Sequence, residues 1–259
     1  MMMNIFLQSG VLILGFVTLV WIISLFKKDA GIMDIFWGLG FIFTALFVYM
    51  HQHEYNLYNL ILVLMVVIWG LRLAIYIGLR NHGKPEDPRY RAWREQNGSA
   101  WWWRSYFKVF LLQGTVMWIV SLPLIYFLYT EKTESISILA IAGISIWTIG
   151  FIIETTADAQ MRRFKMKPDN KGKILDKGLW GRSRHPNYFG EALVWCGFGL
   201  IGISIGNWLS LISPILMNFL LVKVSGVKML DELMLKTKEG YREYMNKTNA
   251  FIPRLGGAR

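Results

Sequence analysis

Seven long runs of apolar residues constrain the fold of this chain more than any other feature of its sequence. The runs cover about residues 5–26, 31–50, 57–79, 106–129, 136–157, 189–205 and 207–224. A helix needs about 20 apolar residues to cross the hydrocarbon core of a bilayer, and 54% of the 259 residues are hydrophobic. The sequence therefore predicts an all-α polytopic membrane bundle with seven transmembrane helices, and residues 1–255 as a single integral membrane domain.

The two ends of the chain need separate interpretation. The last two apolar runs are short, with Gly206, Asn207 and Trp208 between them. They predict a helical hairpin, and one long bent helix is the alternative. The first run has no basic segment before it and no small-residue cleavage pattern after it, so we interpret it as a retained span. Residues 256–259 resemble the remnant of an expression tag.

The positions of the cationic residues predict the orientation of the bundle. Of the 28 Lys and Arg residues, 26 follow the first, third, fifth or seventh apolar run. The other connections contain only Lys132. Cytoplasmic loops of membrane proteins are enriched in Lys and Arg, so we expect the N-terminus outside and the C-terminus inside. Because the net charge of +11 is confined to these loops, it indicates topology or a phosphorylated ligand, and we predict no nucleic-acid partner.

Cysteine and histidine residues do not form a metal-ligand pattern. The single Cys196 lies in an apolar run and excludes an internal disulfide or a cysteine zinc cluster. His51 and His53 lie in an outer connection, whereas His82 and His185 lie in inner connections, so the four side chains cannot converge. We therefore predict no metal site. A P-loop and a GxGxxG segment after a strand are also missing from the sequence.

Ionisable residues inside the apolar runs, or at their ends, indicate where a site lies. They are Asp34, Arg72, Glu154, Asp158 and Glu191. A charge at the centre of a bilayer costs about 3 kcal/mol, so these groups need partners or a water-filled cavity. Glu154 and Asp158 are four residues apart and share a helix face. Structural ion pairs are the alternative for each residue, but the whole set predicts a polar cavity that opens to the cytoplasm.

The densest polar segment covers residues 158–191. Its nine Lys and Arg residues suit phosphate groups. Pro186 fits the first turn of a helix, where free N–H groups favour an anion. Asn187 and Glu191 are able to hydrogen-bond an amide or a ribose. A basic loop that contacts anionic lipid is the alternative.

The segment GLWGRSRHPNYFGE at 178–191, with Trp195 and Gly197 after it, resembles the C-terminal signature of the membrane steroid 5-alpha reductase superfamily, most closely its bacterial branch of small membrane proteins. Other similar segments occur in order at 34–40, 69–73, 80–84, 86–93, 240–244 and 250–253. The resemblance implies a reductase that uses NADPH to reduce a carbon–carbon double bond conjugated to a ketone. It further implies a hydrophobic, steroid-like or lipid-like substrate, contact with membrane lipids, and a bacterial inner membrane with the cofactor site facing the cytoplasm.

The same resemblance implies which residues bind the cofactor. They are Asn81, Lys84, Glu154, Asp158, Arg162, Lys165, Arg184, His185, Asn187, Tyr188 and Glu191. Steroid reductases polarise the ketone with a Gln-Glu pair in the second run and a Tyr in the third. This chain has no such Gln-Glu pair, and Trp69 lies near the place of the Tyr. Asp34, Trp69 and Arg72 are therefore the predicted catalytic residues.

Reduction of an enone needs a hydride near the β-carbon and a hydrogen-bond donor at the ketone oxygen. A buried carboxylic acid that stays protonated can be that donor, which makes Asp34 the candidate. The alternative for Asp34 is an ion pair or hydrogen bond with Arg72.

Two other classes of protein remain open. The Arg-His-Pro-Xaa-Tyr pattern also occurs in membrane isoprenylcysteine methyltransferases, whose S-adenosylmethionine pocket would suit Asp231, Glu232, Tyr241 and Tyr244. The nine cations favour the phosphates of NADPH over a cationic sulfonium. A transporter or non-enzymatic membrane protein is the third class, but we detect no repeated halves. The segment 101–103, three successive Trp residues, predicts an interfacial anchor, with a lid over a lipid-like substrate as the alternative.

Overall fold

The structure is a computed structural model that describes residues 2–52, 55–130, 136–224 and 226–254. Over these residues every regular element is helical, apart from one isolated bridge between Ser183 and Asn249. Six of the described helices are long and apolar enough to cross a membrane. The predicted all-α membrane fold is therefore confirmed, whereas the count of seven spans and their orientation stay predictions. The predicted tag remnant at 256–259 lies outside the described residues.

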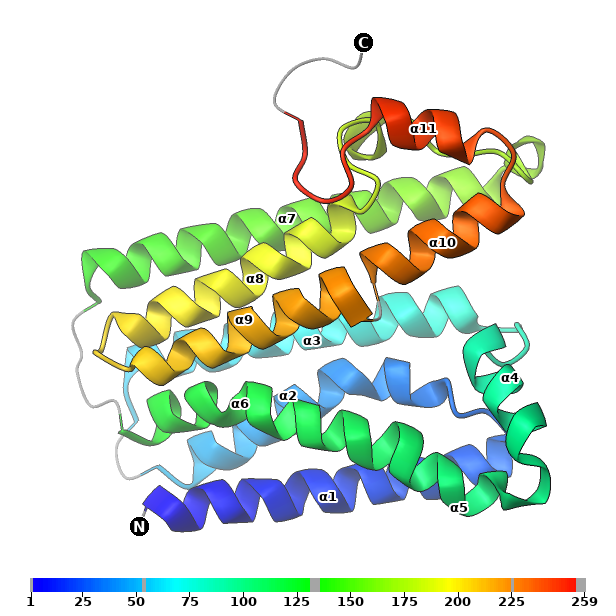
Figure 1. Cartoon of the computed structure of the whole chain (residues 1–259). Coiled ribbons are helices and arrows are strands. Elements are labelled where there is room, and N and C mark those ends of the chain that lie inside the picture. Colours follow the sequence, from blue (N-terminus) through cyan, green and yellow to red (C-terminus); the bar gives the residue numbers. More distant parts are fainter. Residues whose placement is uncertain (1, 53–54, 131–135, 225, 255–259) are drawn as a thin grey trace. The chain divides into compact units, whose positions relative to one another are not determined.

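The chain divides into two compact units, Met1–Ile136 and Ser137–Arg259. The helices of the first unit are α1 (Met2–Lys27), α2 (Ile32–Met50), α3 (Leu57–Asn81), α4 (Pro88–Asn97), α5 (Trp101–Ser105) and α6 (Leu112–Thr130) (Figure 1). A 3-10 turn at Gly98–Ala100 precedes α5, and a π-helical turn at Tyr106–Leu111 joins α5 to α6.

Close contact between α2 and α3 positions the predicted catalytic residues of the first unit. A Cβ atom on Gly38 would lie 2.5 Å from the carbonyl oxygen of Gly70. Small residues at such crossings let two helix backbones approach in a membrane. Trp69, beside this crossing, is 0% exposed, and its ring meets Phe41 of α2 edge to face at 5.6 Å. The crossing therefore fixes Trp69 as part of the core of this unit.

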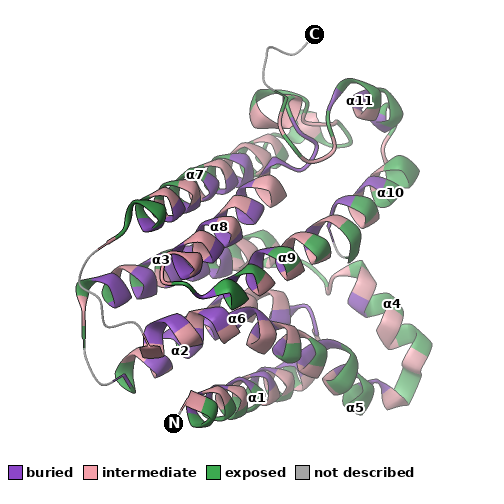
Figure 2. Ribbon diagram, turned by 60° about the vertical axis from the view of Figure 1, so that its left-hand side comes forward, coloured by how far each residue is buried: buried purple, intermediate pink, exposed green. Residues whose placement is uncertain are grey.

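One face of α3 carries apolar side chains that remain exposed. They are Leu60, Leu64, Ile68, Leu71 and Ile75, and they recur every three or four positions, which places them on one side of the helix. Figure 2 shows such exposed positions in green. An exposed apolar stripe of this length suits contact with lipid.

The helices of the second unit are α7 (Ile138–Met166), α8 (Pro186–Ile203), α9 (Ile212–Phe219), α10 (Val227–Thr237) and α11 (Tyr241–Lys247). Short 3-10 turns occur at Pro168–Asn170, Gly178–Gly181 and Trp208–Leu211, and a π-helical turn at Leu220–Val224 follows α9. In Figure 1, α7, α8 and α9 lie side by side. The 18-residue α8 is not among the six helices counted above.

A helical hairpin joins α8 to α9, as the sequence predicts. The chain reverses at Gly206, whose φ of 77° is readily adopted only by glycine. The hydroxyl of Ser210 then donates to the carbonyl oxygen of Gly199 at 2.9 Å, so the returning segment packs on α8. The alternative of one long bent helix is wrong.

Glycines draw α7 and α8 together as an antiparallel pair. A Cβ on Gly197 would lie 2.6 Å from the carbonyl oxygen of Gly143, and a Cβ on Gly150 would lie 2.6 Å from that of Gly190. The two glycines of each helix are seven residues apart, about two helical turns. This spacing places both contacts on one face of each helix, and it brings the first turns of α8 against the second half of α7.

Candidate functional site

Buried carboxylates gather where α8 begins beside α7. Glu154 and Asp158 of α7 are 3% and 4% exposed, and Glu191 of α8 is also buried. The amide of Asn187 donates to the carboxylate of Asp158 at 3.3 Å. A Cβ on Gly190, the neighbour of Glu191, would lie 2.5 Å from the backbone nitrogen of Glu154. The structure thus brings four predicted cofactor-binding residues to one junction of two helices.

Two predicted cations continue the same face of α7. Arg162 and Lys165 follow Asp158 by four and seven residues, so the three side chains share one side of the helix. Both cations are exposed, whereas Asp158 is buried. The face therefore changes from buried carboxylates to exposed cations over about two turns.

The 3-10 turn at Gly178–Gly181 packs on α7 close to Asp158. The indole N–H of Trp180 donates to the carbonyl oxygen of Ala157 at 2.9 Å. The backbone N–H of Leu179 donates to the side chain of Gln160 at 3.0 Å. Gly178 permits this approach, because its φ is +64° and a Cβ there would lie 2.7 Å from Gln160. These contacts hold the entry of the chain into α8.

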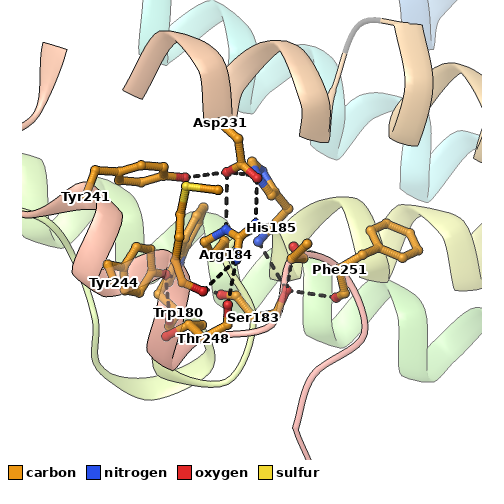
Figure 3. A network of polar contacts seen from close by, with 11 residues as sticks. Trp180, Ser183, Arg184, His185, Asp231, Tyr241, Tyr244, Thr248 and Phe251 are labelled. Atoms are coloured by element: carbon orange, nitrogen blue, oxygen red, sulfur yellow. Dashed lines mark hydrogen bonds and ion pairs between the residues drawn. The ribbon is translucent and has the colours of Figure 1, made fainter. Parts of the chain in front are cut away.

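Arg184 is occupied by contacts within the protein (Figure 3). Its guanidinium donates through Nε and Nη2 to the two oxygens of Asp231, at 3.3 and 2.7 Å. Its Nη1 donates to the carbonyl oxygens of Met245 and Thr248, at 3.2 and 2.7 Å. Arg184 is 8% exposed. A buried bidentate pair of this kind fixes the geometry of the turn.

His185 and Tyr241 complete the contacts of Asp231. His185 Nε2 lies 3.0 Å from Oδ1 of Asp231, and the hydroxyl of Tyr241 donates to the same oxygen at 2.5 Å. Burial raises the pKa of the Tyr241 phenol, and the hydrogen bond to Asp231 raises it further, so Tyr241 remains a donor at neutral pH. On its other side, the His185 ring stacks on Tyr188 with centroids 5.6 Å apart. One carboxylate therefore holds both residues that precede Pro186.

The segment after α11 lies along the turn at 182–185. The backbone N–H of Arg184 donates to the carbonyl oxygen of Asn249 at 2.8 Å. The hydroxyl of Ser183 donates to the carbonyl oxygen of Phe251 at 2.8 Å. The hydroxyl of Tyr244, on α11 itself, donates to the carbonyl oxygen of Trp180 at 2.5 Å. Sequence reasoning assigned Asp231, Tyr241 and Tyr244 only to the alternative methyltransferase pocket. No sequence pattern links these three residues to the Arg-His-Pro turn, so their contacts with it were not predicted.

Asp34 of the first unit pairs with Arg89, a partner that the sequence did not predict. Its Oδ2 lies 3.3 Å from Arg89 Nη2, and its Oδ1 accepts a 2.8 Å hydrogen bond from the Tyr90 hydroxyl. Gln113 donates in turn to that hydroxyl at 3.2 Å. The partners of Asp34 lie on α4, because Asp87 caps this helix at Arg89 N and Pro88 begins it. Sequence reasoning treated this segment as a loop.

The remaining predicted residues of the first unit lie on α3 and just after it. The guanidinium of Arg72 lies over the ring of Tyr76 at 5.6 Å. Asn81 accepts a 3.1 Å hydrogen bond from Arg80 Nε, and Lys84 donates to the backbone oxygen of Arg80. Arg80 thus links Asn81 and Lys84 at the end of α3.

Replacing Tyr90 by phenylalanine is expected to lower the free energy of unfolding by about 1–2 kcal/mol, because Asp34 loses a hydrogen bond in a partly buried position. Thermal unfolding of the detergent-solubilised protein measures the effect. Tyr55→Phe is the matched control, since the Tyr55 side chain is 65% exposed. An equal melting temperature for both variants would show that the Tyr90–Asp34 contact contributes nothing.

Comparison with known proteins places the chain in a family. The profile of a family described as protein of unknown function (DUF1295) matches residues 20–248. The bovine 3-oxo-5-alpha-steroid 4-dehydrogenase 1 is 34% identical over 68 residues, which are 26% of each chain. The human protein of the same name is 33% identical over 24% of each chain. An uncharacterized protein of Schizosaccharomyces pombe is 22% identical over 95% of this chain and 80% of its own length.

The chain therefore matches about a quarter of the length of the named steroid dehydrogenases. No solved structure shows significant similarity to it. The family match covers most of the sequence. This protein belongs to the DUF1295 family, within the steroid 5-alpha reductase-like superfamily.

Proposed function

We propose that the protein is a membrane reductase that uses NADPH to reduce a carbon–carbon double bond conjugated to a ketone in a hydrophobic substrate. The observation that carries the proposal is the junction of α7 and α8, where Asn187 meets Asp158 beside the buried Glu154 and Glu191. The superfamily, and the steroid dehydrogenase names of the partial relatives, agree with a reductase.

The residues at this junction fit the chemistry of a dinucleotide phosphate. Buried carboxylates can accept hydrogen bonds from ribose hydroxyls. The amide of Asn187 can both donate to and accept from a carboxamide. The exposed Arg162 and Lys165, two turns further along α7, suit phosphate oxygens. The face therefore offers carboxyl and amide groups at one end and positive charge at the other. When bound, the nicotinamide supplies a hydride.

Roles for the individual residues follow from their contacts. Glu154, Asp158, Asn187, Tyr188 and Glu191 are proposed to contact the cofactor. Arg184 and His185, whose side chains are held by Asp231, are proposed to position the first turn of α8. Asn81 and Lys84 of the first unit are proposed as further cofactor contacts. The positive-inside rule puts the basic loops in the cytoplasm, so we propose that the cofactor enters from there.

The end of the site that binds the substrate ketone is proposed to include Asp34, Trp69 and Arg72. The contacts of Asp34 narrow its role, because both of its oxygens already accept hydrogen bonds, from Tyr90 and Arg89. The ion pair with Arg89 stabilises the ionised carboxylate, which has no proton to give, so Asp34 acts as a donor only in its protonated form.

Binding of NADPH to the detergent-purified protein tests the proposal. A ligand that binds only the folded state raises the melting temperature, so we expect stabilisation by NADPH and none by S-adenosylmethionine. The double variant Asn187→Ala/Glu191→Ala should lose at least tenfold in affinity. Its matched control is Asn246→Ala/Glu243→Ala, which changes the same residue types at exposed positions on α11 and should bind NADPH like the original chain.

Stabilisation by S-adenosylmethionine, with none by NADPH, would move the protein to the methyltransferase class. Equal NADPH affinity in both double variants would remove the α7–α8 junction from the cofactor site. Once binding is established, oxidation of NADPH in the presence of hydrophobic enones identifies the substrate class, and a transporter would show no such oxidation.

A further inference from the structure

A cavity of about 400 Å³ lies within the first unit, between the end of α1 and the segment from α4 to α5. Its volume falls in the range of small-molecule sites. Ser24 and Leu25 of α1, Arg94 of α4, and Ser99, Trp101 and Ser105 are among the residues that line it. None of the residues assigned above to cofactor or ketone lines this cavity, so the reductase proposal leaves it without a function.

Arg94 is held in place by Glu86. Its Nε donates to one carboxylate oxygen at 2.9 Å and its Nη2 to the other at 2.8 Å. The same carboxylate accepts the backbone N–H of Ala30 at 2.8 Å, which ties α4 to the turn before α2. The Nη1 group of Arg94 has no hydrogen-bond partner within the part of the chain that the structure describes. A fixed guanidinium with one free end is suited to bind an oxyanion.

Two serine hydroxyls in the cavity act as acceptors toward a ligand. Ser24 Oγ donates to the carbonyl oxygen of Trp21 at 2.7 Å, and Ser105 Oγ donates to that of Trp102 at 3.0 Å. Each hydroxyl has one proton, which these contacts use, so its lone pairs remain to accept. The cavity thus combines donors for an oxyanion with acceptors for ligand O–H groups.

The surroundings of the cavity resemble a membrane–water boundary. Trp102 and Phe107 are 58% and 57% exposed. Arg104 lies over the ring of Trp103 at 5.3 Å, and Lys108 lies over that of Trp93 at 4.3 Å. Exposed tryptophans mark the headgroup level of a bilayer, and basic side chains there attract anionic lipids. The ligand chemistry and the location therefore point to a phospholipid.

We propose that this cavity binds the headgroup of an anionic glycerophospholipid with free hydroxyl groups, of the phosphatidylglycerol type. The phosphodiester accepts hydrogen bonds from Nη1 of Arg94. The headgroup hydroxyls donate to Ser24 and Ser105, and the acyl chains leave past Trp102 and Leu25. A choline headgroup lacks O–H donors and would bring a cation next to Arg94, so the site discriminates against phosphatidylcholine.

Native mass spectrometry of the full chain, released from nanodiscs of equal phosphatidylglycerol and phosphatidylcholine with matched acyl chains, tests the proposal. We expect phosphatidylglycerol to be retained at least tenfold over phosphatidylcholine. Arg94→Gln should reduce this ratio to near one. Because that change also leaves Glu86 without its partner, Ser99→Phe, which fills the cavity from an exposed position, should have the same effect in a stably folded chain.

Lys27→Gln is the control, since it removes one exposed positive charge near the same end of α1 without lining the cavity. It should retain phosphatidylglycerol like the original chain. Equal retention of the two lipids by the original chain would overturn the proposal, and so would unchanged selectivity in Ser99→Phe. Thermal stabilisation by water-soluble glycerol phosphate that equals stabilisation by the lipid would overturn a lipid as the ligand. None of these three results bears on NADPH binding at the α7–α8 junction.

Discussion

Asp231→Asn is expected to lower the free energy of unfolding by about 3–5 kcal/mol and to abolish NADPH binding. Arg184, which is buried, would lose its paired carboxylate, and leaving one buried charge without its partner has this cost. The amide of Asn offers one oxygen in place of two, so His185 and Tyr241 would compete for it with Arg184. Thermal melting and NADPH titration in the same detergent measure the two effects.

The neighbouring Glu232→Gln is the matched control for this prediction. Glu232 is exposed on the same helix, so the same change from carboxylate to amide should leave both the melting temperature and the NADPH affinity within error of the original chain. If Asp231→Asn behaved like Glu232→Gln, the contacts of Arg184 would not be what holds the turn before α8.

Gly190→Ala is expected to lower the free energy of unfolding by about 3 kcal/mol. The added methyl group would lie 2.5 Å from the backbone nitrogen of Glu154 and 2.7 Å from the carbonyl oxygen of Gly150. Both contacts are backbone atoms, so relief requires α7 and α8 to move apart, and overpacking of this kind costs about 1–3 kcal/mol or more. The separation would also carry Asn187 away from Asp158 and weaken NADPH binding at least tenfold.

Gly15→Ala makes the same chemical change in an open position. A Cβ on Gly15 of α1 meets nothing within 4 Å, so the variant should melt at or slightly above the temperature of the original chain. Comparing the two variants separates the steric effect at the α7–α8 crossing from the general effect of replacing a helical glycine. Equal melting temperatures would show that the two helices tolerate a wider separation.

The sequence was sufficient to predict the membrane helices, because apolar runs of about 20 residues have one stable solution in lipid. The hairpin at Gly206 was predictable because Gly206, Asn207 and Trp208 separate two short apolar runs. In contrast, α4 is polar and has no apolar run, and its only signals were Asp87 as a capping residue and Pro88 in the first turn. The pairing of Asp34 with Arg89 was therefore not predicted, since Arg89 lies on this unpredicted helix.

Part of the candidate site was predictable and part was not. Glu154 and Asp158 share a face by helical period alone, and Asn187 follows the Pro that begins α8. The contact of Arg184 with Asp231 joins residues 47 positions apart, and no local pattern determines which of several carboxylates meets a given arginine. That pairing depends on how α10 and α11 fold back on the unit, and this is decided by tertiary packing.

The hydrogen bonds between the turn at 182–185 and the segment at 248–254 can form only late in synthesis of the chain. A ribosome adds about 5–20 residues per second, so residue 249 is made about 1.5–6 seconds after the end of α9 at Phe219. Arg184 has no Asp231 to bind until residue 231 has been made, and the carbonyl oxygens of Met245 and Thr248 follow later still. The contacts that hold the turn before α8, and with them the proposed cofactor site, are therefore among the last features to form in the nascent chain.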